Sequence, residues 1–105
     1  MKSEYMLDSE SYVVIKDDRI IGFISLMGQE IGGLFIDPLF NRQGYGTLLL
    51  QLCFSLRSNW QVKVFSRNKI AREFYKKAGF KKVYKKIHSG SGEEMIIMEF
   101  QQLIQ

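Results

Sequence analysis

The fold is decided by the stretch Leu34-Phe35-Ile36-Asp37-Pro38-Leu39-Phe40-Asn41-Arg42-Gln43-Gly44-Tyr45-Gly46. An apolar run ends at Asp37-Pro38, because proline fixes φ and cannot donate to a strand ladder. A basic turn with two glycines follows and opens a helix. The free N–H groups at a helix start attract anions, and glycine lets a phosphate approach the backbone closely. A pyrophosphate would fit, although a tight strand-to-helix turn is the simpler explanation of the glycine pair alone.

Elements of regular structure surround this stretch on both sides. Alternating and β-branched segments predict strands near residues 12–16, 19–27, 30–36, 60–65, 82–87 and 94–100. Asp17-Asp18 predicts a hairpin turn, and Ser89–Gly92 predicts another. Helices are expected from Gly44 or Tyr45 to Arg57 and from Lys69 to Ala78. The order favours an α/β (α+β) fold, with a mixed, mostly antiparallel central sheet, a βαβ crossover and two main helices. About eleven residues precede the first clear strand.

The two predicted helices differ in their apolar faces. In the first, polar side chains recur every four positions, leaving a wide apolar arc that predicts burial on more than one side and favours a homodimer (Thr47, Gln51, Ser55). In the second, Ser66 or Asn68 is the expected N-cap and Gly79 the expected C′ residue. Its apolar residues are expected on one face (Ile70, Ala71, Phe74, Tyr75, Ala78).

Length and composition bound the possibilities. A chain of 105 residues suits a single domain covering residues 1–105. Hydrophobic residues make up 46% and charged residues 25%, which argues against disorder. One cysteine excludes an internal disulfide framework, and no metal site is expected. No apolar run is long enough to cross a bilayer and the acidic N-terminus does not resemble a signal peptide, so we expect a cytoplasmic protein without a membrane partner.

Positive charge is concentrated in the second half of the chain. The net charge is +4, and the stretch from Gln61 to Gly90 holds ten basic residues with Glu73 as its single acid. Such a segment is typical of a partner that carries phosphates or carboxylates. A solvated surface without a partner explains it equally well.

A second motif follows one strand after the glycine turn. It reads Asn68-x-x-Ala71-x-x-Phe74-Tyr75-x-x-x-Gly79-Phe80. Together with Pro38-x-x-x-x-x-Gly44-x-Gly46, it resembles the GNAT family of N-acetyltransferases over residues 19–100. The resemblance implies the GNAT acyl-CoA N-acyltransferase fold and a transfer of acetyl from acetyl-CoA to a primary amine.

The same resemblance implies which residues bind acetyl-CoA. The turn that holds the pyrophosphate maps to seven consecutive residues (Asn41, Arg42, Gln43, Gly44, Tyr45, Gly46, Thr47). The strand whose backbone pairs with the pantetheine arm maps to Leu34, Phe35 and Ile36, and positions near the thioester map to Asn68 and Tyr75. Family members usually carry Arg or Gln where Asn41 stands and often Gly where Arg42 stands, so the positive charge is shifted here by one residue.

Two side chains are candidate catalysts. A phenol ionises near pH 10 and a thiol near 8.5, so Tyr75 could protonate the departing sulfur. A core aromatic is the alternative. Glu30 stands where family members often place a base, and a solvated carboxylate is its alternative. Cys53 is expected to be buried and Glu73 to be exposed, and neither has a catalytic role.

Three functions from different classes remain open at this level. The leading one is an enzyme that acetylates an amine of a small molecule or a protein. The second is a catalytically weak module that binds CoA without turnover. The third and least favoured is a basic nucleic-acid-binding protein, motivated by the lysine-rich second half. The short N-terminal region predicts an acceptor side that is open or covered by a second subunit.

Overall fold

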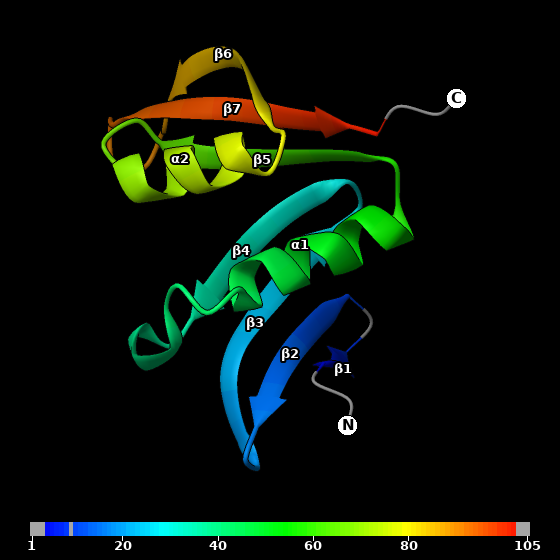
Figure 1. Cartoon of the computed structure of the whole chain (residues 1–105). Helices are drawn as coiled ribbons and strands as arrows, with labels where there is room; N and C mark the ends of the chain where they lie inside the picture. Colours follow the sequence, from blue (N-terminus) through cyan, green and yellow to red (C-terminus); the bar gives the residue numbers. More distant parts are fainter. Residues whose placement is uncertain (1–3, 9, 103–105) are drawn as a thin grey trace.

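The computed structural model describes residues 4–8 and 10–102, which form one seven-stranded sheet with two main helices on one face (Figure 1). The elements in chain order are β1 (Glu4–Asp8), β2 (Ser11–Lys16), β3 (Arg19–Met27), β4 (Glu30–Ile36), the short 3₁₀ helix η1 (Pro38–Phe40), α1 (Tyr45–Leu56), β5 (Asn59–Phe65), α2 (Lys69–Lys77), β6 (Lys81–Ile87) and β7 (Glu94–Gln101). The sheet order is β1-β2-β3-β4-β5-β7-β6.

Every neighbouring pair of strands is antiparallel except β4 and β5, which are joined through α1. The predicted mixed, mostly antiparallel sheet with a βαβ crossover is therefore confirmed. One strand was missed: β1 pairs with β2, so the expectation that the first strand begins near Tyr12 was wrong. The segment that precedes β2 carries three acidic residues, and these masked its strand character (Glu4, Asp8, Glu10).

The core lies between the sheet and α1, which packs on β3, β4 and β5. Alternate residues of β5 point toward the helices, and among them Trp60 is 1% exposed. Its indole N–H donates to the carbonyls of Cys53 (2.9 Å) and Arg57 (3.1 Å), which fixes the end of α1 to the start of β5. The wide apolar arc of α1 is only partly buried, since Leu56 remains 42% exposed.

One prediction about α2 was wrong. Asn68 caps the helix by accepting the N–H of Ala71 at 3.1 Å, as expected, and Gly79 takes the left-handed φ of 108° that ends it. Ile70, however, is 85% exposed and does not share the buried face. Ala71 and Tyr75 centre that face, and one residue step around a helix turns a side chain by about 100°. Ile70 therefore points outward from the first turn.

Candidate functional site

The central feature of the site is the divergence of β4 from β5. Their ladder consists of two pairs, Glu30↔Gln61 and Ile31↔Val62. Gly32 is an extra residue relative to β3, because Leu26 pairs with Ile31 while Ser25 pairs with Gly33. A bulge of this kind bends its strand. Beyond it, β4 stays on β3 while β5 follows β7, so the sheet opens between them (Figure 1).

The glycine turn lies where β4 ends, beside this opening. Asp37 accepts the N–H of Leu39 at 2.9 Å, which starts η1 and turns the chain away from the sheet. Arg42 (φ 63°) and Gly44 (φ 88°) then adopt left-handed conformations before α1 begins. Gly44 is the N-cap and no side chain caps the helix start. The first N–H groups of α1 therefore keep their capacity to bind an anion.

Lys16, which sequence reasoning did not identify, supplies a cation at the same turn. Its Nζ donates to the Tyr45 hydroxyl at 3.3 Å and lies 6.0 Å from the Phe40 ring. It reaches this position from the end of β2, far from the turn in sequence. The hairpin turn at Asp17-Asp18 was correctly predicted, and both residues adopt left-handed conformations (φ 50° and 63°). The contact of the preceding Lys16 with α1 could not be predicted, because it forms only when the sheet folds.

Tyr75 lies on α2 and belongs to the core cluster on the helix side of the sheet. It is 6% exposed and makes edge contacts with the rings of Phe74 (5.1 Å) and Phe80 (5.2 Å). Within the described residues, no group forms a hydrogen bond with its hydroxyl. Burial, reinforced by the nearby Cys53, raises the pKa of Tyr75 to about 12. The phenol therefore keeps its proton over the whole pH range in which enzymes work.

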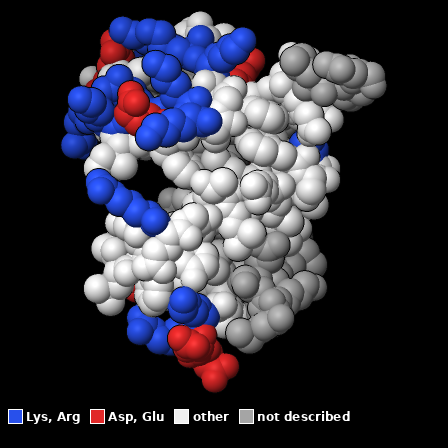
Figure 2. Space-filling view, viewed as in Figure 1, with Lys and Arg blue, Asp and Glu red and all other residues white. Residues whose placement is uncertain are grey.

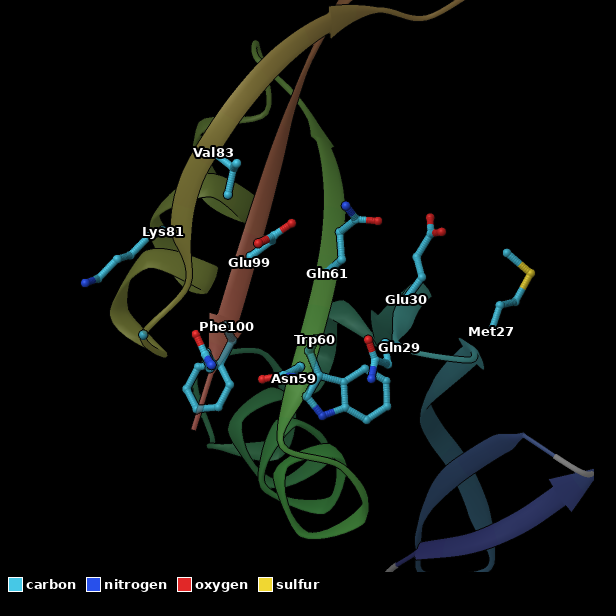
Figure 3. Close-up of a pocket in the computed structure, with 12 residues that line it drawn as sticks. Met27, Gln29, Glu30, Asn59, Trp60, Gln61, Lys81, Val83, Glu99 and Phe100 are labelled. Carbon is cyan, nitrogen blue, oxygen red and sulfur yellow. The ribbon is translucent and has the colours of Figure 1, made fainter. Parts of the chain in front are cut away.

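Glu30 lies on the opposite face of the sheet. Its carboxylate is 3.5 Å from Nζ of Lys63, and it lines a pocket of about 850 Å³ (Figure 3). Register places Met27, Glu30, Gln61, Glu99 and Lys81 in one row across five strands. Figure 3 shows Glu30, Gln61 and Glu99 beside one another on neighbouring strands.

Gln61 and Glu99 are polar lining residues that sequence reasoning missed. Both occupy outward positions of strands whose alternation was visible in the sequence. Gln61 and Glu99 become neighbours only because β5 pairs with β7, and these two strands are far apart in the sequence. Tyr75 and Glu30 lie on opposite faces of the sheet: Tyr75 belongs to the core cluster on the helix side, and Glu30 pairs with Gln61 beside the point where β4 and β5 separate. Asn68, by contrast, uses its side-chain oxygen to cap α2.

The arrangement is that of a known family. A family model described as "Acetyltransferase (GNAT) domain" matches residues 8–82. The chain belongs to the GNAT acetyltransferase family. Within the described part of this GNAT domain, no group of three or more His, Cys, Asp or Glu side chains is placed to hold a metal ion. No helix of the described residues is long and apolar enough to cross a membrane.

Individual relatives agree with this assignment. The GNAT domain is 35% identical over 80 residues to the peptidyl-lysine N-acetyltransferase YjaB of Salmonella typhimurium, covering 75% of this chain and 55% of the relative. It is 27% identical to the peptidyl-lysine N-acetyltransferase YiaC of Escherichia coli, covering 76% and 56%. The solution structure of apo YjaB from E. coli superposes with a TM-score of 0.79 at 28% identity, covering 89% and 65%. The chain thus spans about half the length of the curated relatives it matches.

The buried cysteine yields a first prediction. Cys53 is fully buried in α1, and burial raises its pKa to about 12 even though Arg57 nearby acts in the opposite direction. Only the thiolate attacks disulfides, so at pH 8 the native protein should react with a disulfide reagent on the order of a thousandfold more slowly than a free thiol. Unfolding in urea should restore the ordinary rate. A native rate equal to the unfolded one would show that Cys53 is accessible and ionised.

Proposed function

We propose that this domain transfers an acetyl group from acetyl-CoA to a lysine side chain of a protein, by direct attack of the amine on the thioester. The divergence of β4 and β5 after Ile31 carries the proposal, because it leaves an open strand edge in a sheet that has a buried phenol on its helix side and a carboxylate on its other face. The lysine acceptor is inferred from YjaB and YiaC, both named as peptidyl-lysine N-acetyltransferases.

The residues present suit acetyl-CoA. The start of α1 offers uncapped N–H groups, a glycine at φ 88° and the cations Arg42 and Lys16 for a pyrophosphate. The seven turn residues from Asn41 to Thr47 would hold that group. The backbone from Leu34 to Ile36 borders the opening and could pair with the amides of the pantetheine arm, as an added strand would.

Catalysis then needs two proton movements. A lysine ammonium has a pKa near 10.4, so it must lose a proton before its nitrogen can attack. Glu30, whose carboxylate lies 3.5 Å from Nζ of Lys63, is the proposed acceptor of that proton, directly or through water. Backbone N–H groups at the bulge around Gly32 are suited to stabilise the oxyanion that forms on the thioester carbonyl.

Collapse of that oxyanion breaks the carbon–sulfur bond. Tyr75 is suited to deliver its proton to the sulfur as the bond breaks, because the phenol is un-ionised and its hydroxyl is not engaged by the described residues. The pocket beside Glu30 is the proposed entrance for the acceptor. Its carboxylates and amides suit a cationic side chain (Glu30, Gln61, Glu99).

The proposal predicts that acetyl-CoA stabilises the fold. A ligand at a hundred times its dissociation constant adds about 2.7 kcal/mol, which raises the melting temperature of a domain this small by roughly 10 °C. Arg42→Gln should weaken this shift by removing a cation from the turn. The matched control is Lys86→Gln on the exposed strand β6, which should leave the shift intact. No shift with the parent protein would remove the acetyl-CoA site.

A further inference from the structure

A second concave site lies on the side of α2 that faces β6 and β7. It is a cleft of about 540 Å³, lined by Arg72 and Lys76 of α2 and by Lys81 and Lys82 at the start of β6. Phe80, Ile96 and Met98 form an apolar part of its lining, and Glu73 is the single carboxylate among the described lining residues. Figure 2 shows lysine and arginine side chains gathered over this part of the molecule.

The cleft is separate from the acetyl-CoA turn. The sheet order places β7 and β6 beyond β5, on the far side from the opening between β4 and β5. On α2 itself, Tyr75 packs into the core, whereas Arg72 and Lys76 line the cleft. The glycine turn from Asn41 to Thr47 contributes none of the lining.

The cations of the cleft form no close ion pairs among the described residues, although Lys82 helps to lower the pKa of the Glu94 carboxyl and Lys81 also lines the pocket beside Glu30. Among the described residues, the ion pairs of the basic stretch from Gln61 to Gly90 use Lys63, Arg67 and Lys85. None of the four cleft cations forms one. The Nε of Arg72 is buried and finds no hydrogen-bond partner in the described part of the chain, which leaves a charged donor unsatisfied there. Gathering four positive charges around one hollow costs electrostatic free energy that an anion would recover.

We propose that this cleft binds a ligand with two or more phosphoryl groups, independently of acetyl-CoA. Four cations around one carboxylate match the charge of a diphosphate, and guanidinium and ammonium donors are the usual phosphate partners. The volume is in the range of small-molecule sites. Its apolar lining has room for an organic group attached to the phosphates, as in a nucleoside diphosphate. Inorganic polyphosphate shares the phosphoryl chemistry without the organic group.

The test is calorimetric titration of the full chain with tripolyphosphate and with ADP, each with and without saturating acetyl-CoA. We expect binding in all four cases. The double variant Lys76→Gln/Lys82→Gln should weaken it at least tenfold, whereas Lys77→Gln, on the same helix but outside the lining, should weaken it less than twofold. Arg42→Gln should leave it unchanged. If ADP binds more tightly than tripolyphosphate, the apolar lining contacts the nucleoside. If tripolyphosphate binds more tightly, the site is one for inorganic polyphosphate.

Other outcomes would overturn the proposal. Absence of binding would refute it directly. Loss of binding under acetyl-CoA, or in Arg42→Gln, would place the phosphates at the glycine turn. If Lys77→Gln weakened phosphate binding as much as the double variant does, the binding would come from diffuse surface charge. If the same variants also weakened binding of a DNA duplex equally, the basic surface would be a nucleic-acid-binding surface. Failure of acetyl-CoA binding would remove the proposed function and leave the cleft testable, because the variants at α2 and β6 report on the cleft alone.

Discussion

Tyr75→Phe should reduce the rate of acetyl transfer at least about a hundredfold while leaving the affinity for acetyl-CoA unchanged. General acids contribute roughly a hundredfold to ten-thousandfold, and the substitution removes one hydroxyl from an otherwise intact ring. Because Tyr75 packs against Phe74 and Phe80 through its ring, the variant should fold normally. The measurement is single-turnover transfer to a lysine peptide, with acetyl-CoA affinity determined separately.

The pH profile adds a second readout of the same role. In the parent protein the rate should rise with pH as the acceptor amine loses its proton. The pKa of Tyr75, raised to about 12, predicts that the acid stays protonated, so no alkaline fall should occur below about pH 10. Tyr84→Phe, an exposed tyrosine on β6, is the matched control and should keep the parent rate.

Three results would contradict this assignment. A Tyr75→Phe variant as fast as the parent would show that the phenol is not the acid. A parent protein that binds acetyl-CoA tightly and transfers nothing to any amine would favour the CoA-binding module instead. Weakened acetyl-CoA binding in Tyr75→Phe would indicate a structural role for the hydroxyl.

Trp60→Ala should lower the free energy of unfolding by about 3–5 kcal/mol, the cost of emptying a large aromatic from a packed core. Trp60 is 1% exposed, and its N–H bonds hold the carbonyls of Cys53 and Arg57. At roughly 4–8 °C per kcal/mol, the melting temperature should fall by at least about 12 °C. Urea titration followed by circular dichroism measures both quantities.

Trp60→Phe separates the two contributions of that side chain. Phenylalanine keeps most of the buried ring and loses the two hydrogen bonds, so we expect a smaller loss, on the order of 1–2 kcal/mol. The stacked guanidinium of Arg57, 5.3 Å from the indole, belongs to the same cluster and pairs with Glu10. A Trp60→Ala variant that melts within 2 °C of the parent would show that α1 and β5 are held together elsewhere.

Local chemistry explains what the sequence predicted well. Asp37-Pro38 ended β4, Asn68 capped α2, and Gly79 took its left-handed turn, since each feature depends on neighbouring residues in the chain. The order of the elements followed from hydrophobic periodicity. The role of the glycine turn came from family resemblance, because its local pattern also fits an ordinary turn.

Long-range packing explains what was missed. Ile70 matched the apolar pattern of α2, but its exposure depends on where the sheet lies beneath the helix. Lys16 reaches Tyr45 from another strand, and Glu99 joins Glu30 only through the register of β5 between them. The bulge at Gly32 depends on pairing with β3. Each of these features depends on residues that are distant in the sequence, so the local sequence pattern does not predict it.

The two-pair ladder between β4 and β5 also creates a strand edge in the middle of the sheet. Exposed edges invite other chains to pair with them, and proteins commonly protect them with lysine. The outer edge strand β6 carries that protection, with four lysines in seven residues. The inner edge strand β4 (EIGGLFI) carries no lysine, and Glu30 is its single charged residue. An extended ligand in this opening would therefore do more than supply an acetyl group: it would also cover an unpaired strand edge to which a second chain could otherwise add.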